Sequence, residues 1–230
     1  TPRSMQQFRV GCELVRSGAI GTVDRVLCSF GDPAVPCDLP EEAMESGLDW
    51  DLWLGPSPAR GYSSVLSPRG IHAHFPDWRN YREFGGGMVT DWGAHHIDIA
   101  TWAIGEDKLG SGPVTIDGTD AKHPVPYKDG YATVDDSYNT SHDYNVISKF
   151  PSGIEMHVTS RGDNGVLFEG SKGRIFVNRE KIVGKPIEEQ WDKDKYTDED
   201  VVRLYKGKPY EGHKDNFYRC IRVRGLPVSD

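Results

Sequence analysis

Side chains capable of chemistry concentrate in residues 91–98, which read Asp-Trp-Gly-Ala-His-His-Ile-Asp. On an α-helix, residues at i, i+4 and i+7 share one face, so Asp91, His95 and Asp98 should converge while His96 points about 100° away. A carboxylate beside an imidazole fixes its tautomer and raises its basicity, as acid/base catalysis requires. The spacing therefore predicts a catalytic pair, Asp91 and His95, with Asp98 close by.

The ordinary alternative for such a pattern is a histidine bonded to an aspartate on a solvated helix surface. Two features favour the catalytic interpretation. Gly85, Gly86 and Gly87 come just before the predicted helix and allow another backbone or a ligand to approach closely. The helix is otherwise apolar, which makes its polar face exceptional.

The residues before the glycines offer two further hypotheses. His72 and His74, together with Asp91 and His95, could form a Zn or Mn site if residues 72–74 were a strand. In a loop, His72, His74, Trp78 and Arg79 are more simply substrate-pocket residues, and the Arg79 guanidinium could bond a sugar hydroxyl or a carboxylate. We favour this second hypothesis, so we predict no metal and a substrate-binding set of His72, His74, Trp78, Arg79 and Asp98.

The elements that must position these residues follow from periodicity and from turn signals. Residues 31–82 contain no long periodic segment, and their aromatic content favours a binding loop. Apolar residues at helical spacing predict helices over 5–17, 88–104 and 213–224. Alternating, β-branched segments predict strands over 22–30, 114–118, 137–150, 154–161, 166–169 and 174–178.

Short turns at 151–153 and 171–173 join neighbouring strands and imply antiparallel pairing. The sequence therefore predicts an α+β fold, a predominantly antiparallel open β-sheet with helices packed on one face. An antiparallel sheet with one uncovered face tends to bury that face, so we also expect a homo-oligomer through the open sheet face.

Composition excludes several partners. The net charge is -8 and no cluster of basic residues occurs, so nucleic acid is not an expected partner. No apolar run reaches the roughly 20 residues of a membrane helix, and we expect no membrane partner. The four cysteines form no CxxC pair and are expected to be buried free thiols. The chain lacks an initiator Met and opens almost directly into a helix, so we expect a truncated start.

Residues 85–98, Gly-Gly-Gly-Met-Val-Thr-Asp-Trp-Gly-Ala-His-His-Ile-Asp, resemble the C-terminal domain of the Gfo/Idh/MocA family of nicotinamide-dependent oxidoreductases. Residues 13–21, 50–56, 78–79, 168–173, 212–217 and 225–227 extend the resemblance over nearly the whole chain. It implies that Asp91 and His95 are the family's active-site Asp and His, with Asp98 as a following acid.

The resemblance also implies a cofactor, NAD or NADP, held mainly by a Rossmann domain that supplies a catalytic Lys. This sequence has no GxGxxG after a strand and no Glu-Lys-Pro. We therefore expect residues 1–230 to be the substrate-binding and oligomerisation domain of a dehydrogenase acting on a sugar, glycoside or polyol, inactive alone. The alternatives are a metal-dependent hydrolase or isomerase using His72, His74, Asp91 and His95, and a non-catalytic sugar-binding or structural domain.

Overall fold

The computed structural model describes residues 2–31, 39–67, 77–185 and 211–229. Its helices are η1 (Pro2–Ser4), α1 (Gln6–Arg16), α2 (Trp50–Leu54), η2 (Asp77–Asn80), α3 (Trp92–Ile104) and α6 (His213–Val223). Its strands are β1 (Val23–Ser29), β2 (Thr115–Asp117), β3 (Tyr127–Lys128), β4 (Tyr131–Ala132), β5 (Asn145–Lys149), β6 (Glu155–Thr159), β7 (Gly165–Gly170), β8 (Gly173–Val177) and β9 (Ile182–Gly184).

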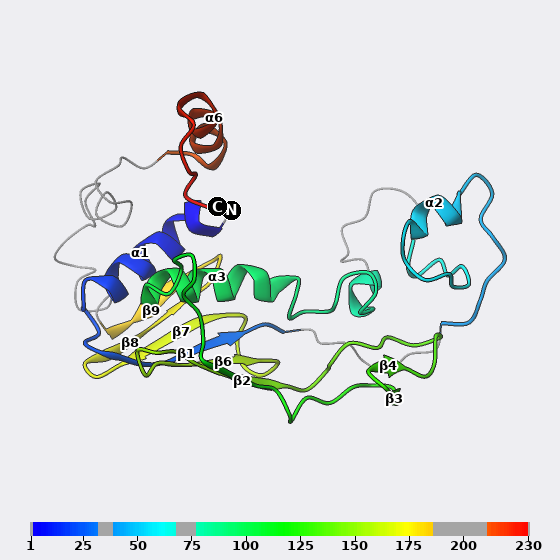
Figure 1. The fold of residues 1–230 in the computed structure, drawn as a ribbon, viewed down its shortest axis with the longest axis horizontal. Helices are drawn as coiled ribbons and strands as arrows, with labels where there is room; N and C mark the ends of the chain where they lie inside the picture. The colour runs from blue at the N-terminus through cyan, green and yellow to red at the C-terminus, as the bar shows by residue number, and fades with distance from the viewer. Residues whose placement is uncertain (1, 32–38, 68–76, 186–210, 230) are drawn as a thin grey trace.

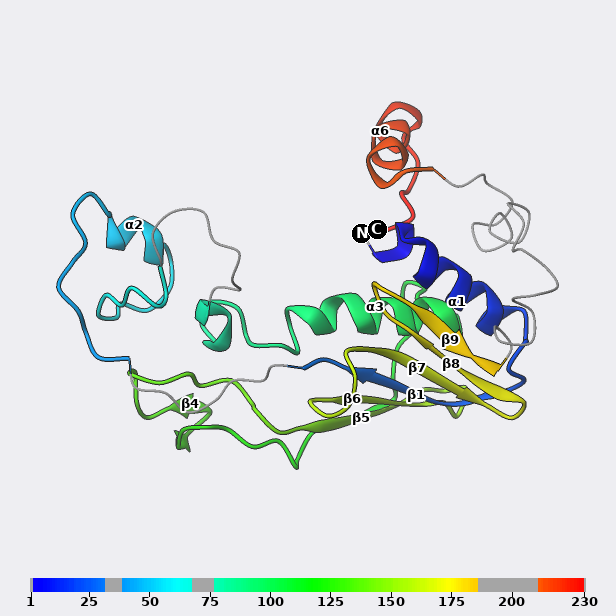
Figure 2. The same cartoon turned by 180° about the vertical axis from the view of Figure 1, so that it is seen from behind.

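Seven strands form one open sheet in the order β2-β5-β6-β1-β7-β8-β9. All neighbours in it pair antiparallel except β1 and β6, which run parallel. Helices α1 and α3 lie side by side on one face of this sheet, and none of the described helices lies on the other face (Figures 1 and 2). The predicted open, mostly antiparallel sheet with helices on one face is confirmed.

The core lies between the sheet and the two helices. Because side chains alternate along a strand, every second residue of β1 points towards the helices, and Val26 and Cys28 are fully buried there. Phe8 of α1 and Ile99 of α3 belong to the same buried cluster, on the helix side of the sheet. Each fully buried large apolar side chain contributes about 1.5–3 kcal/mol, so this layer is what fixes α3 over the sheet.

Several predicted boundaries were wrong. The predicted helix 88–104 begins only at Trp92, because Gly86 and Gly87 adopt positive φ angles (72° and 78°) and hold the preceding residues in turns. The predicted strand 137–150 is a strand only from Asn145 onwards. Its first part instead bonds to residues 80–83, through Thr140 and Asn139.

Residues 39–67 form a small lobe around α2, which Figure 1 shows well away from the sheet. Its aromatic side chains form their own core: Trp50 stacks on Trp53 at 4.4 Å, and Tyr62 meets Trp50 edge-on. The Arg60 guanidinium lies 3.8 Å above the Tyr81 ring and pairs with Glu83. Three of the aromatic residues that suggested a binding loop, Trp50, Trp53 and Tyr62, thus pack within this lobe, and Tyr81 packs against it.

Three of the four cysteines, Cys12, Cys28 and Cys220, are buried and free, as predicted; Cys37 lies outside the described residues. Burial raises the pKa of the Cys12 and Cys28 thiols far above their usual range, so both stay protonated at neutral pH. None of the helices in the described ranges has the length and apolar character of a membrane span.

Candidate active site

Asp91 ends the turn that leads into α3, and its carboxylate is held by Arg79. The Arg79 Nε donates to Asp91 Oδ2 at 2.8 Å, and both side chains are partly exposed. Arg79 sits in η2 with its guanidinium 4.6 Å from the Trp78 ring centroid. The structure therefore brings together two residues that the sequence analysis assigned separately, Asp91 to catalysis and Arg79 to substrate.

The predicted contact between Asp91 and His95 takes a different form. Asp91 precedes α3 instead of lying within it, and its bond goes to Arg79. No residue in the described ranges is hydrogen-bonded to the His95 imidazole. Asp91 and Asp98 still act on His95 through their charges, so both carboxylates lie near it.

The pKa of His95 is held below its usual 6.5. Burial of the ring is the main cause, and nearby positive charge, chiefly that of Arg179, adds to it; the charges of Asp91 and Asp98 oppose the shift. His95 is therefore neutral at physiological pH, with a ring nitrogen able to accept a proton. Its side chain is only half-buried, so a small molecule can reach it.

His96, the adjacent residue, has a different environment. It is 1% exposed, and three aromatic rings surround it edge-on at centroid distances of 5.7–6.5 Å. Its Nε2 donates to Asn164 Oδ1 at 2.8 Å, which ties α3 to the segment before β7. Burial lowers the pKa of His96 to about 4. The two rings thus face different surroundings, as helical phase predicts, and His96 is a packing residue.

The three glycines before α3 let protein segments approach closely. A Cβ on Gly85 would lie 2.9 Å from the Arg79 Cα, and one on Gly87 would lie 2.7 Å from the Thr140 Cβ. Gly93, in the first turn of α3, sits against the ring of Phe30. These close contacts bring η2 next to the start of α3, and so bring Arg79 to Asp91.

Asp98, predicted to bind substrate or orient the site, is engaged elsewhere. The Arg3 guanidinium donates to both of its carboxylate oxygens, at 2.6 and 2.9 Å from Nη2 and Nε. Arg3 is buried while the Asp98 side chain stays partly exposed, and the ion pair fastens η1 to α3.

His72 and His74 lie outside the described residues. Their assignment to the substrate pocket stays a prediction, and the metal site that uses them stays the alternative. Within the described ranges, no three His, Cys, Asp or Glu side chains gather as a metal site would require. Trp78 and Arg79 are described, and η2 places both at the approach to α3.

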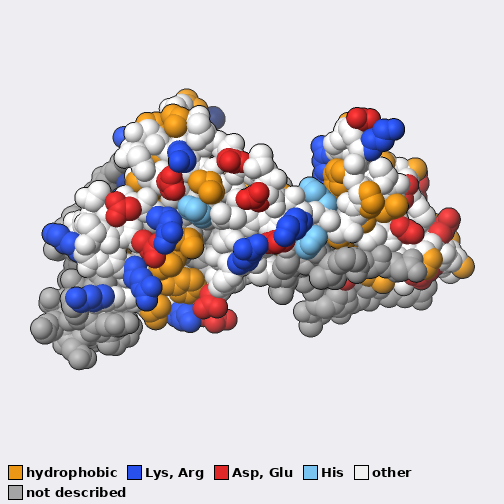
Figure 3. Space-filling model, turned by 90° about the horizontal axis from the view of Figure 1, so that it is seen from below, with side chains coloured by type: hydrophobic (Ala, Val, Ile, Leu, Met, Phe, Trp, Pro, Cys, Tyr) orange, Lys and Arg blue, Asp and Glu red, His pale blue; other side chains and the backbone are white. Residues whose placement is uncertain are grey.

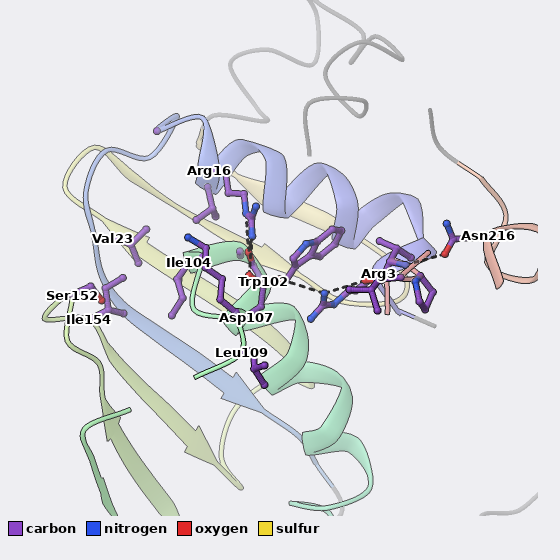
Figure 4. Close-up of a pocket in the computed structure, with 18 of the residues that line it drawn as sticks. Arg3, Arg16, Val23, Trp102, Ile104, Asp107, Leu109, Ser152, Ile154 and Asn216 are labelled. Atoms are coloured by element: carbon purple, nitrogen blue, oxygen red, sulfur yellow. Dashed lines mark hydrogen bonds and ion pairs between the residues drawn. The ribbon is translucent and has the colours of Figure 1, made fainter. Parts of the chain in front are cut away.

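A cavity of about 1080 Å³ runs along the other end of α3 and is lined by none of the predicted site residues (Figure 4). Its walls come from the C-terminal halves of α1 and α3, the strand ends near Val23 and Ile154, and the segment around α6. The arginines in its walls are already ion-paired: Arg3 and Arg16 with Asp107, and Arg219 with Glu211. No histidine is among the described residues that line it.

Two residues near the site were missed by the sequence analysis. Asn164 anchors His96, and Arg179, in the turn between β8 and β9, places its guanidinium 4.2 Å from the Trp92 ring centroid. Both come from segments that are distant in sequence from α3. No local pattern could have revealed them, because only strand pairing across β7 and β8 brings them to the start of the helix.

Comparison with known proteins gives one family match. Residues 35–189 match the family described as the oxidoreductase family, C-terminal alpha/beta domain, of the Gfo/Idh/MocA group. Comparison with curated proteins gives no match.

Several solved structures share the fold. Levoglucosan dehydrogenase in complex with NADH and L-sorbose is 15% identical with a TM-score of 0.52, covering 100% of this chain and 57% of that one. The WlbA dehydrogenase from Bordetella pertussis, in complex with NADH and UDP-GlcNAcA, is 13% identical with a TM-score of 0.52, covering 99% of this chain and 53% of that one. The chain thus spans little more than half the length of these structures.

At such low identity the structural likeness shows the fold alone, and the family match extends over more than half of the chain. The match includes the glycines, the Asp91–His95 segment and every strand of the sheet except β1. It omits α1, β1 and α6, of which α1 and β1 pack in the same core as the matched residues. This chain belongs to the Gfo/Idh/MocA oxidoreductase family, as its C-terminal α/β domain.

Proposed function

We propose that this chain is the substrate-binding and oligomerising domain of an NAD(P)-dependent dehydrogenase that acts on a hydroxyl of a sugar, glycoside or polyol. The observation that carries the proposal is the neutral, half-buried His95 beside the Arg79–Asp91 pair, at the end of α3 where glycines let η2 approach closely. An acid/base group of this kind is what oxidation of an alcohol requires.

The proposed roles follow from the proton balance of the reaction. Oxidation of an alcohol releases a proton from the hydroxyl while a hydride leaves the carbon, and the nicotinamide supplies the hydride acceptor. His95 accepts the hydroxyl proton, because its pKa is held below the usual range and the ring is unprotonated at neutral pH. Asp91 stabilises the resulting imidazolium through its charge, and Arg79 fixes the direction of that carboxylate.

The described residues do not provide a site for the cofactor pyrophosphate. Such a site needs a glycine-rich turn whose backbone N–H groups face the ligand at a helix N-terminus. The glycines before α3 instead pack against Arg79 and Thr140. The proposal therefore assigns the cofactor, NAD or NADP, to a separate nucleotide-binding domain, in keeping with the share of the related structures that this chain spans.

The open face of the sheet supports the proposed homo-oligomer. Strand register places one row of side chains across six neighbouring strands, β5 to β9 in sheet order. Five of the six are apolar, and the sixth is His157 of β6: the apolar ones are Ile147, Leu27, Leu167, Phe176 and Val183. None of these side chains belongs to the core on the helix side. Figure 3, which views this face, shows apolar side chains gathered among charged ones.

The next row carries charges of both signs, Lys149, Glu155, Arg25, Glu169 and Arg174, with ion pairs Lys149–Glu155 and Arg25–Glu169. A row of alternating sign can pair with its own copy across a two-fold axis, as an isologous interface requires. We therefore assign the apolar row of the open face to the centre of a dimer interface.

Calorimetric titration with NADH tests the proposal that a separate domain, and not this chain, binds the cofactor. The 230-residue chain should show no binding, while the same chain extended by the sequence encoded upstream should bind and should reduce NAD(P)⁺ with sugars or polyols. Micromolar binding of NADH by the chain alone, or an upstream sequence without a nucleotide-binding domain, would contradict the proposal.

A further inference from the structure

Of the charged side chains that act on His95, the two carboxylates are ion-paired, and the arginine is not, within the described part of the chain. Asp91 is paired with Arg79, and Asp98 is paired with Arg3. Arg179 acts on His95 through its charge, yet within the described part of the chain its guanidinium makes no ion pair or hydrogen bond. The charged group near His95 that is left without a counter-ion among the described residues is therefore the positive one, Arg179.

The backbone of Arg179 is held in place by its neighbours. Asn178 closes the turn by accepting from the backbone N–H groups of Glu180 and Lys181, both at 2.9 Å. The Asn178 side chain also donates to the Asn164 carbonyl at 3.2 Å. On the other side, Gln7 of α1 donates to the Arg179 carbonyl at 3.2 Å. The turn is thus fastened to the segment that anchors His96 and to a core helix.

The side chain is also restrained. Its guanidinium carbon lies 4.2 Å from the centroid of the Trp92 ring, and Trp92 is the first residue of α3. Stacking of this kind orients the plane of the guanidinium while leaving its N–H edge free to donate. Less rotamer freedom is then lost when a ligand binds, and the free edge matches the two oxygens of a carboxylate or a phosphate.

We propose that Arg179, stacked on Trp92, binds an anionic group of the substrate at the Asp91–His95 site, so that the substrate is a sugar bearing a carboxylate or a phosphate. This inference rests on the proposed function, because it deepens the substrate class of the same site. A bound anion would offset the charge of Arg179 and raise the pKa of His95 towards its usual value, which makes His95 a stronger base once substrate is present.

The test measures binding without cofactor or turnover. The NMR signals of the His95 ring and the Trp92 indole are followed in the 230-residue chain during titration with D-glucuronate, D-glucose 6-phosphate, D-glucose and inorganic phosphate. We expect one or both acidic sugars to shift these signals at lower concentration than D-glucose or inorganic phosphate does. Tighter binding of D-glucuronate would identify the anionic group of the substrate as a carboxylate, and tighter binding of D-glucose 6-phosphate would identify it as a phosphate.

Substitutions of Arg179 test whether its guanidinium is the group that binds the acidic sugar. Arg179→Gln should weaken binding of the preferred acidic sugar by about tenfold or more, the usual effect of losing a charge-assisted bond, and leave D-glucose unaffected. Arg179→Lys should retain part of the affinity, because it keeps the charge without the planar fork. Arg222→Gln is the matched control, since it removes an exposed arginine from α6.

Four results would overturn the inference: no shift with either acidic sugar at tens of millimolar; equal binding of D-glucose; equal binding of inorganic phosphate; or unchanged binding in Arg179→Gln. Failure of the proposed dehydrogenase function is separate, because it would appear as absent hydride transfer in the extended protein while anion binding by this chain persisted.

Discussion

The adjacent residues His95 and His96 lie on different faces of α3, and only His95 can be reached by a small molecule. His95 is half-buried with no hydrogen-bond partner among the described residues, whereas His96 is enclosed by aromatic rings and bonded to Asn164. Both pKa values are lowered mainly by burial. A proton acceptor must be reachable by substrate, as the half-buried His95 is, whereas a buried anchor such as His96 need not be.

The burial of His96 should make stability depend on pH. Its pKa is about 4 in the folded chain and near 6.5 when unfolded, so the unfolded state binds more protons between these values. The contribution is present above pH 6.5 and is lost as the pH falls towards 4, at about 1.4 kcal/mol per pH unit or roughly 3 kcal/mol in all.

Urea unfolding of wild type and His96→Gln at several pH values measures this effect. Glutamine can still donate to Asn164 but does not titrate, so the variant should lose less free energy of unfolding between pH 6.5 and 4 than wild type does. Parallel curves for the two proteins would mean that His96 is not the responsible group.

At the residue level, part of the site could be predicted from the sequence. The spacing of Asp91 and His95 identified the segment, and helical phase separated His95 from His96. The pairing of Asp91 with Arg79 could not be predicted, because it depends on close approach of two backbones at Gly85. The side chain of Asp98 was available to Arg3 only because η1 packs beside α3.

The start of α3 is the element on which the site depends. Gly86 and Gly87 hold positive φ angles, the residues after them form turns, and the Gly93 N–H bonds back to the Met88 carbonyl. The helix therefore begins four residues later than its apolar periodicity predicts. Periodicity describes which residues face the core, and it is insensitive to where helical hydrogen bonding begins.

Gly87→Ala should destabilise the chain by about 1–3 kcal/mol, because a side chain at φ 78° is strained and its Cβ would lie 2.7 Å from Thr140. Gly105→Ala is the matched control: its φ is 81°, but no atom lies within 4 Å of the added Cβ.

Chemical denaturation of both variants isolates the contact at Gly87. We expect Gly87→Ala to lose more free energy of unfolding than Gly105→Ala. If the two variants lost the same amount, the backbone strain alone would explain the effect and the close packing on Thr140 would contribute nothing.

The positions of the strands were predicted well where apolar and polar residues alternate. Pairing between strands that are distant in sequence could not be predicted. Residues 22–30 and 154–161 contain β1 and β6, yet their parallel pairing leaves no signal in either segment. The short strands β3, β4 and β9 were missed, since two or three residues are too few to show a period.

At the scale of the whole molecule, the sheet has one covered face and one open face. The apolar row that includes Leu27, Leu167 and Phe176 crosses the open face, and a dimer would remove it from water. Leu167→Lys should therefore shift the chain from dimer to monomer in sedimentation or light scattering.

The control for this experiment is Leu109→Lys, since Leu109 is fully exposed away from the sheet. It should leave the dimer intact. A wild-type chain that is monomeric at tens of micromolar, or a Leu167→Lys variant that dimerises as well as wild type, would remove the open face from the proposed interface.

The central claim is that His95 exchanges the substrate proton. Steady-state kinetics of two variants, in the chain extended by the proposed nucleotide-binding domain, test it most directly. His95→Ala should lower kcat by about 10²–10⁴-fold, the usual effect of removing a positioned acid/base, with cofactor affinity nearly unchanged. His96→Ala should chiefly lower stability, by on the order of 2–5 kcal/mol, because it empties a buried site.

Folded His96→Ala, measured below its unfolding temperature, should keep kcat within about tenfold of wild type, since the His96 ring is buried and bonded to Asn164. The opposite pattern, with His96→Ala inactive while folded and His95→Ala near wild type, would contradict the account and transfer the catalytic role to His96.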